Sequence, residues 1–309
     1  MTITALGPGV EFDIIRRLVE RWGPRASGIG DDAAAVDVPR GDVMIVSVDS
    51  AIEGQHLRGD WLSPSEMGYR AVAAALSDLA AMGARPRGVL IALGLPEAWR
   101  GRVDGIADGV GEAVSSCRTT ILGGNLSAAG ELSITTTVLG SSFAPLMRGG
   151  AKPGDHVYVT GLLGGPGAAL ARLLSGQPAE SYRDRFAHPV PRLEEGRWLA
   201  DAGCTAAIDI SDGLAADARH VAAASGVVLE LDGQRVPCVE GVDASAAVRS
   251  GEEYELLVTA PNALDAVAFE ARFQLPLTEI GRVVAGQPGT VHIAGVPNSS
   301  LTGHDHFSR

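Results

Sequence analysis

The sequence predicts two domains that each mix strands with helices, an α+β or mixed α/β architecture. The chain has 309 residues, and a domain of about 150 residues is a common size. Strand and helix patterns follow one another in both halves without a regular βαβ repeat. Residues 143–154 are rich in glycine and proline and lack periodicity, which predicts a boundary that divides the chain into 1–145 and 146–309.

The N-terminal half contains one strong helix signal. Ser63 is a capping residue, Pro64 occupies the first helical position, and Glu66 follows the cap by three residues. This helix should run to residue 82 and end at Gly83, and its apolar middle predicts burial on several sides. Further helices are predicted at 11–22 and 96–117, and strands at 43–48 (buried), 89–95, 119–122 and 131–139.

After the boundary the alternation of strands and helices starts again. Strands are predicted at 156–160, 206–210, 227–231, 254–259, 279–284 and 290–294. Helices are predicted from the glycine-rich turn at 161–167 to residue 174, and at 192–202, 214–224 and 263–273. Residues 175–191 are predicted to form a polar connection.

Composition excludes several classes of protein. The formal net charge is −12, and no dense run of Lys or Arg offers a site for nucleic acid. The N-terminus lacks the pattern of a signal peptide, and no apolar run reaches the length of a membrane span, so we expect a cytoplasmic protein without a membrane partner. The three cysteines form no CxxC pair, so we expect neither a zinc site nor a disulfide framework.

Acidic residues gather where apolar elements end or break. Asp32 lies in a glycine-rich loop, Asp49 follows an apolar strand, Asp78 interrupts an apolar helix, and Asp209 and Asp212 flank the end of another strand. Each could be a helix cap, a turn former or an ion-pair partner. Together they favour Mg²⁺, because a carboxylate in an apolar element is costly unless it is paired or binds a metal. Magnesium binds a few carboxylates plus substrate phosphates, so several acids suggest a phosphate-bearing substrate with more than one metal ion.

Glycine-rich segments support a phosphate substrate. The chain has 40 glycines, almost twice the usual share of about 7%. The segments GIGDD at 28–32, GGN at 123–125 and GLLGGPG at 161–167 can each present backbone N–H groups to an anion. Neither the P-loop nor the Rossmann motif is present in the sequence, and the HRD and DFG kinase motifs are absent too.

Eight motifs in order resemble the thiamine-monophosphate kinase family, whose superfamily includes aminoimidazole ribonucleotide synthetase and selenophosphate synthetase. They are GIGDDAA (28–34), SVDSAIEGQHL (47–57), ALSDLAAMGARP (75–86), GGNLS (123–127), RGGAKPGDHVYVTG (148–161), IDISDGLAADARH (208–220), SGEEYEL (250–256) and GHDHF (303–307).

The resemblance implies a fold and a reaction. It implies an N-terminal α+β domain whose mixed sheet forms a barrel-like interface in a homodimer, and a C-terminal α/β domain packed against it, with the ATP site between them. The family transfers the γ-phosphoryl group of ATP directly to thiamine phosphate, giving thiamine diphosphate and ADP. No residue acts as nucleophile or general base, since such transfer depends on positioning, metal ions and charge stabilisation.

The resemblance also assigns residues to roles. The Mg²⁺ ligands match Asp32, Ser47, Val48, Asp49, Asp78, Asn125, Asp209 and Asp212. The ATP contacts match Asp32, Gly124, Asn125, Arg148 and Ser211, and the thiamine-phosphate contacts match His56, Glu252 and His304. The family commonly has Asp at position 125, Thr at 48 and an aromatic residue at 304, so this chain lacks one ligand charge, one ligand hydroxyl and one stacking ring.

Two alternatives stay open at this point. The chain could be an ATP-dependent relative that acts on another small acceptor. It could also be a non-catalytic protein that binds nucleotide or thiamine phosphate, which the substitutions at Val48 and Asn125 would permit.

Overall fold

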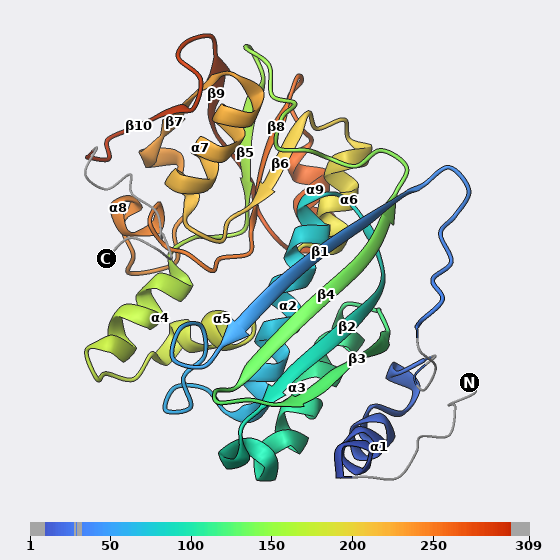
Figure 1. Ribbon diagram of the computed structural model, residues 1–309. Coiled ribbons are helices and arrows are strands. Elements are labelled where there is room, and N and C mark those ends of the chain that lie inside the picture. The colour runs from blue at the N-terminus through green and yellow to red at the C-terminus, as the bar shows by residue number, and fades with distance from the viewer. Residues whose placement is uncertain (1–9, 28, 30–32, 298–309) are drawn as a thin grey trace. The chain divides into compact units, whose positions relative to one another are not determined.

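The computed structural model describes residues 10–27, 29 and 33–297 (Figure 1). The chain divides into two compact units. Unit 1 comprises Met1–Leu79 and Arg85–Phe143, and unit 2 comprises Ala80–Ala84 and Ala144–Arg309. Each unit contains a sheet and helices, which confirms the predicted α+β class.

Unit 1 is built on a four-stranded sheet with the order β1-β4-β2-β3. The strands are β1 (Val43–Ile52), β2 (Arg85–Leu95), β3 (Ile121–Ala128) and β4 (Ser133–Ser142). β4 pairs antiparallel with both β1 and β2, whereas β2 and β3 are parallel. The alternation predicted around residues 131–139 is confirmed, because Ile134, Thr136 and Val138 are fully buried on one face of β4.

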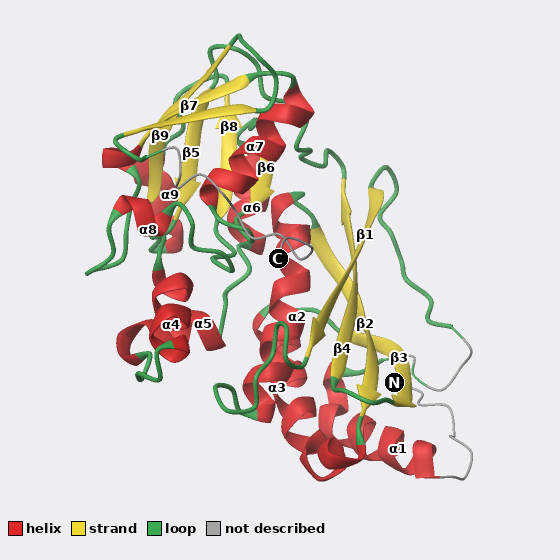
Figure 2. Cartoon of the chain, turned by 60° about the vertical axis from the view of Figure 1, so that its left-hand side comes forward, coloured by secondary structure: helices red, strands yellow, loops and turns green. Residues whose placement is uncertain are grey.

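Helices α2 (Pro64–Ala81) and α3 (Val103–Ser116) lie along one face of this sheet, as Figure 2 shows. The predicted cap of α2 is present: the Glu66 N–H donates to Ser63 Oγ at 3.3 Å, and the Ser63 N–H donates to Glu66 Oε2 at 2.7 Å. Helix α1 (Val10–Trp22) packs on α3 and β3 and is followed by a short 3₁₀ turn, η1 (Gly23–Arg25).

Unit 2 contains a six-stranded sheet with the order β10-β7-β9-β5-β8-β6. The strands are β5 (His156–Thr160), β6 (Ala206–Asp209), β7 (Val228–Asp232), β8 (Leu256–Ala260), β9 (Leu277–Val284) and β10 (Thr290–Ala294). The helices are α4 (Gly165–Leu174), α5 (Arg183–Ala187), α6 (Leu193–Asp201), α7 (Leu214–Ser225), α8 (Ala244–Ala247) and α9 (Ala266–Phe273), with 3₁₀ turns η3 (Glu180–Tyr182) and η4 (Gly233–Arg235). Helix α7 packs on β6, β7, β8 and β10 and closes an apolar core made mainly of Val, Leu, Ile and Ala.

Several predicted boundaries are wrong, and tertiary pairing explains most of the errors. Strand β1 does not stop at Asp49 but pairs with β4 as far as Ile52. Nor is β1 buried throughout, because it forms an edge of the sheet and leaves Val46 58% exposed. The predicted 119–122 strand extends to Ala128, because parallel pairing with β2 outweighs the low strand propensity of its glycines.

Two further predictions about helical segments differ from the structure. Residues 96–117 form a 3₁₀ segment, η2 (Glu97–Arg102), followed by α3, because two turns of tighter hydrogen bonding precede Val103. The polar connection at 175–191 contains η3 and α5, and Phe186 and Ala187 of α5 are buried.

None of the helices in the described part of the chain has the length and apolar character that a membrane span requires.

Candidate functional site

Strand β1 and helix α2 bring two predicted metal ligands into contact. The Ser47 hydroxyl donates a hydrogen bond to the carboxylate of Asp78. Asp49 lies two residues after Ser47, so its side chain points to the same face of β1. Val48 lies on the opposite face and is 62% exposed, so only its backbone carbonyl could serve as a ligand. Unit 1 therefore joins Ser47 to Asp78, 31 residues later in the chain, and places Asp49 on the same face of β1 as Ser47.

The Gly123–Asn125 segment, whose glycines suggest an irregular anion-binding turn, lies instead in the extended strand β3. Gly124 is required by close pairing, because a Cβ at this position would overlap the Ile91 carbonyl of β2. Asn125 lies directly opposite Ala92 in the register and is exposed. The strand thus presents a carboxamide that can donate and accept hydrogen bonds.

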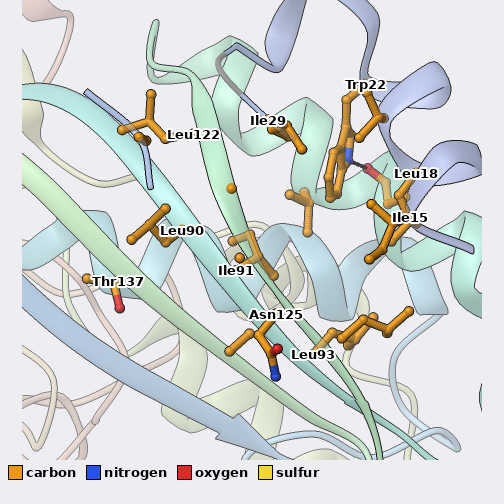
Figure 3. Close-up of a pocket in the computed structure, with 18 of the residues that line it drawn as sticks. Ile15, Leu18, Trp22, Ile29, Leu90, Ile91, Leu93, Leu122, Asn125 and Thr137 are labelled. Atoms are coloured by element: carbon orange, nitrogen blue, oxygen red, sulfur yellow. Dashed lines mark hydrogen bonds between the residues drawn. The ribbon is translucent and has the colours of Figure 1, made fainter. Parts of the chain in front are cut away.

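An apolar cavity of about 850 Å³ opens beside this strand (Figure 3). Its walls come from α1, α3, β2, β3, β4 and the segment before β1, and Gly124 and Asn125 belong to the lining. The indole N–H of Trp22 donates to the carbonyl of Ala107 at 3.0 Å, which ties α1 to α3 along one wall. A cavity of this size and composition suits a flat, largely apolar ring system.

His56 lies in the turn that follows β1 and is half-buried. The Ile52 N–H donates to His56 Nδ1 at 3.3 Å. Because Nδ1 accepts, a neutral His56 ring carries its proton on Nε2.

In unit 2, the DISDG segment joins β6 to α7 and carries two carboxylates, Asp209 and Asp212, with Asp209 buried at the end of β6. Gly213 has a φ of 108°, a conformation that favours glycine, and it allows the chain to turn into α7. The Oδ2 atom of Asp217 accepts the N–H groups of Ser211 at 3.0 Å and Asp212 at 3.1 Å. The side chain of Asp217 therefore fixes the turn that carries Ser211 and Asp212.

Negative charge is concentrated at this turn. Burial, together with the charges of Asp209 and Asp212, raises the pKa of Asp217 to about 8. Oxygen atoms of Asp212 and Asp217 and a ring nitrogen of His220 lie within 4.8 Å of one another. A carboxylate-rich set of this kind fits a hard divalent cation such as Mg²⁺, because the cation would offset the repulsion that raises the pKa of Asp217.

The SGEEYEL segment brings Glu252 to the same turn. The Glu252 N–H donates to the Ser211 carbonyl at 2.7 Å. Glu252 has a φ of 59°, so a non-glycine residue is held in the left-handed region. The structure thus places the predicted substrate residue Glu252 beside the predicted ATP and metal residues Ser211 and Asp212.

The third glycine-rich segment differs from its prediction. The N–H of Gly164 donates to Glu253 Oε1 at 2.6 Å, and the N–H of Gly167 donates to Ser250 Oγ at 2.9 Å. These two amides are therefore not available to a phosphate.

The predicted ATP residue Arg148 is exposed in the segment before β5, and its backbone carbonyl accepts a hydrogen bond from Ser225 Oγ at 3.0 Å.

Two predicted site residues, Asp32 and His304, lie outside the described residues. Conversely, sequence reasoning did not assign the apolar lining of the cavity to a site, because α1 and α3 show the same periodicity whether their apolar faces meet a core or a ligand. It also did not single out His220. The sequence predicts a supporting or capping role for Asp217, and its hydrogen bonds to the N–H groups of Ser211 and Asp212 fit that role.

Comparison with known proteins places this arrangement in a family. The family model described as AIR synthase related protein, N-terminal domain, matches residues 30–142, and the one for the C-terminal domain matches residues 152–294. The thiamine-monophosphate kinase of Salmonella typhimurium is 35% identical over 326 residues, covering 96% of this chain and 98% of that protein.

Solved structures agree with the sequence comparison. The crystal structure of thiamine-monophosphate kinase from Stenotrophomonas maltophilia has a TM-score of 0.81 at 33% identity, and the match covers 93% of this chain and 97% of that one. The structure of AaThiL complexed with AMPPCP and TMP has a TM-score of 0.77 at 28% identity, with 98% of this chain and 100% of that one covered. The chain belongs to the thiamine-monophosphate kinase family of AIR synthase related proteins.

Proposed function

We propose that this kinase transfers the γ-phosphoryl group of ATP to thiamine phosphate, giving thiamine diphosphate and ADP. The main observation behind this proposal is that each of the two units brings oxygen atoms that can bind a metal ion close together. Unit 1 joins Ser47 to Asp78, and unit 2 gathers Asp209 and Asp212 around the turn fixed by Asp217. The relative complexed with AMPPCP and TMP matches almost the whole chain.

Magnesium is the proposed cofactor, in several ions. We assign as ligands Asp32, Ser47, Val48 through its carbonyl, Asp49, Asp78, Asn125, Asp209 and Asp212. When bound, Mg²⁺ neutralises charge on the two phosphate groups that must approach each other. The protein's own contribution is to hold the carboxylates in place: Ser47 orients Asp78, and Asp217 orients the backbone at Asp212.

ATP is proposed to contact Asp32, Gly124, Asn125, Arg148 and Ser211. The apolar cavity beside Gly124 and Asn125 is proposed to receive the adenine ring, since its lining is apolar and its volume of about 850 Å³ exceeds that of a purine. Arg148 supplies a guanidinium that can hold phosphate oxygens with two parallel hydrogen bonds.

Thiamine phosphate is proposed to contact His56, Glu252 and His304. The Nε2–H of His56 can donate to a phosphate oxygen, and the carboxylate of Glu252 can accept from the aminopyrimidine ring or offset the positive thiazolium. Transfer is then direct and in line: the acceptor's own phosphate oxygen attacks, so no side chain of this protein needs to act as nucleophile or general base.

A homodimer is proposed to form through the exposed face of β1. Val46 and Val48 lie on the same face of β1 and are 58% and 62% exposed, so this face of the strand is both apolar and accessible. Leu139, opposite Val46 in β4, extends this face. An exposed apolar strand at a sheet edge favours pairing with a second copy.

We further propose that the protein is cytoplasmic and that its functional domains divide between residues 145 and 146.

The test is turnover by the purified full-length chain. ADP release is followed with ATP, Mg²⁺ and thiamine phosphate, and thiamine diphosphate is identified by chromatography. Thiamine without its phosphate serves as a matched acceptor control, and we expect it to be inactive. ATP binding without thiamine diphosphate formation at any Mg²⁺ concentration would refute the proposal, and ADP release with a different small acceptor would favour the alternative activity.

A further inference from the structure

Glu253 is a buried carboxylate that the proposed reaction does not use. The residue is 5% exposed, and its side chain is completely buried. Oε1 accepts the N–H of Gly164 at 2.6 Å and a hydrogen bond from the Ser250 hydroxyl. Oε2 has no hydrogen-bond partner within the described ranges, and the nearest recorded cation is Arg185, with Nη2 at 3.6 Å.

The two groups that Glu253 and Ser250 hold belong to the first turn of α4. Gly164 is the N-cap of this helix, and Gly167 lies in its first turn. The amides of a first turn have no partner inside their own helix. Here the carboxylate of Glu253 accepts one of them and the hydroxyl of Ser250 accepts another. The SGEEYEL segment, which is distant from α4 in the sequence, therefore caps the N-terminus of this helix.

The same segment contains two strained residues on either side of Glu253. Glu252 has a φ of 59° and Tyr254 a φ of 53°, and neither is glycine. Such conformations persist only where surrounding contacts determine them. The Glu252 N–H donates to Ser211 O at 2.7 Å, and the Tyr254 N–H donates to Ile210 O at 2.9 Å.

We infer that Glu253 is the positioning residue of the acceptor site: by clamping the SGEEYEL segment to the first turn of α4, it holds Glu252 beside Ser211. This inference rests on the proposed function, because Glu252 is assigned to thiamine phosphate there. In this proposal Glu253 does not touch the acceptor, because its carboxylate is bound to Gly164 and Ser250.

Two substitutions of Glu253 show whether its hydrogen bonds, rather than the volume of its side chain, position the segment. Glu253→Ala removes the acceptor for Gly164 and Ser250, whereas Glu253→Gln keeps an oxygen at the same distance. We expect Glu253→Ala to raise the KM for thiamine phosphate about tenfold or more and to change the KM for ATP less than about twofold, because only the acceptor's contact is displaced. Glu253→Gln should restore most of the loss.

Asp265→Ala is the matched control. Asp265 also accepts a first-turn amide, that of Ala268 in α9 at 2.9 Å, but α9 carries none of the assigned residues. We expect its KM for both substrates to equal that of the unmodified chain. Equal rises in both KM values for Glu253→Ala, or no rise at all, would overturn the inference.

A second measurement does not depend on turnover. Amide hydrogen exchange at Glu252 and Tyr254 should be at least about ten times faster in Glu253→Ala than in the unmodified chain, since the strained segment loses its clamp. Unchanged exchange would overturn the positioning role even if the enzyme is active. If the unmodified chain forms no thiamine diphosphate, the proposed function fails, and the exchange result alone decides whether Glu253 holds the segment.

Discussion

The Ser47 hydroxyl donates its hydrogen bond to the carboxylate of Asp78, and this contact ties strand β1 to helix α2. Asp78 interrupts an apolar helix, where a carboxylate is costly without a partner. The Ser47 hydroxyl orients this carboxylate, and the oriented carboxylate is a suitable ligand for a hard cation such as Mg²⁺. The pair therefore predicts a metal-dependent function for Asp78.

Asp78→Asn should lower kcat/KM by about a hundredfold, and Ser47→Ala by about tenfold, because the first removes a ligand charge and the second only its orientation. Both variants should need more Mg²⁺ for half-maximal rate. Steady-state rates measured over a Mg²⁺ series check this. Glu97→Gln is the control, since Glu97 is 81% exposed and pairs only with Arg100 within the described structure. Normal activity of Asp78→Asn at every Mg²⁺ concentration would contradict the assignment.

Local signals in the sequence predicted local structure well. The Ser63 cap with Glu66 and the buried face of β4 are both present, because each depends on residues a few positions apart. Strand β1 was different: its burial depends on whether another strand lies beyond it, and the sequence does not contain that information. The extended backbone at Gly124 likewise depends on the approach of β2, which lies about 30 residues earlier in the chain.

The candidate site, like the fold, could be predicted from the sequence only in part. The acids at positions 49, 78, 209 and 212 were found because charged residues stand out in apolar segments. The apolar cavity could not be found this way, because Ile15, Trp22 and Ala107 have the periodicity of ordinary core residues. The sequence predicts a supporting or capping role for Glu253 but not the helix that it caps, because Gly164 lies 89 positions away.

Gly124→Ala tests whether close strand pairing supports the nucleotide site. The added Cβ would overlap the Ile91 carbonyl, so β2 and β3 must separate. We expect a loss of about 2 kcal/mol or more in the free energy of unfolding, and weaker ATP binding, measured by denaturation and calorimetry. Gly130→Ala is the control, because a Cβ there meets nothing within 4 Å. Equal stability of the two variants would show that the strands tolerate the side chain.

Val46→Lys tests the proposed homodimer. A lysine on the exposed face of β1 places a charge where a second copy would need an apolar surface, which should shift the protein to monomers in analytical ultracentrifugation. Val267→Lys provides the matched control, since Val267 is 80% exposed on α9 in unit 2 and should not alter the assembly. A dimer that survives Val46→Lys at micromolar concentration would place the interface elsewhere.

The pH dependence of stability tests the buried state of Glu253. Burial raises the pKa of this carboxyl from 4.5 to about 7, although its hydrogen bonds with Ser250 and Gly164 and the charge of Arg185 act in the opposite direction. Between these two values the folded chain binds more protons than the unfolded chain. The free energy of unfolding must therefore fall as the pH rises from 4.5 to 7, by up to about 3 kcal/mol from this group.

Glu253→Gln cannot titrate, so it should lose less stability than the unmodified chain between pH 5 and pH 8. Urea denaturation of both proteins at the two pH values gives the difference. Asp217, whose pKa is raised in the same direction, contributes equally to both proteins and cancels. Glu194→Gln controls for the loss of a carboxylate, because Glu194 is 53% exposed beside Arg197 and should leave the pH slope unchanged. Identical slopes for Glu253→Gln and the unmodified chain would mean that Glu253 is ionised in the folded protein throughout this range, with Arg185 compensating its burial.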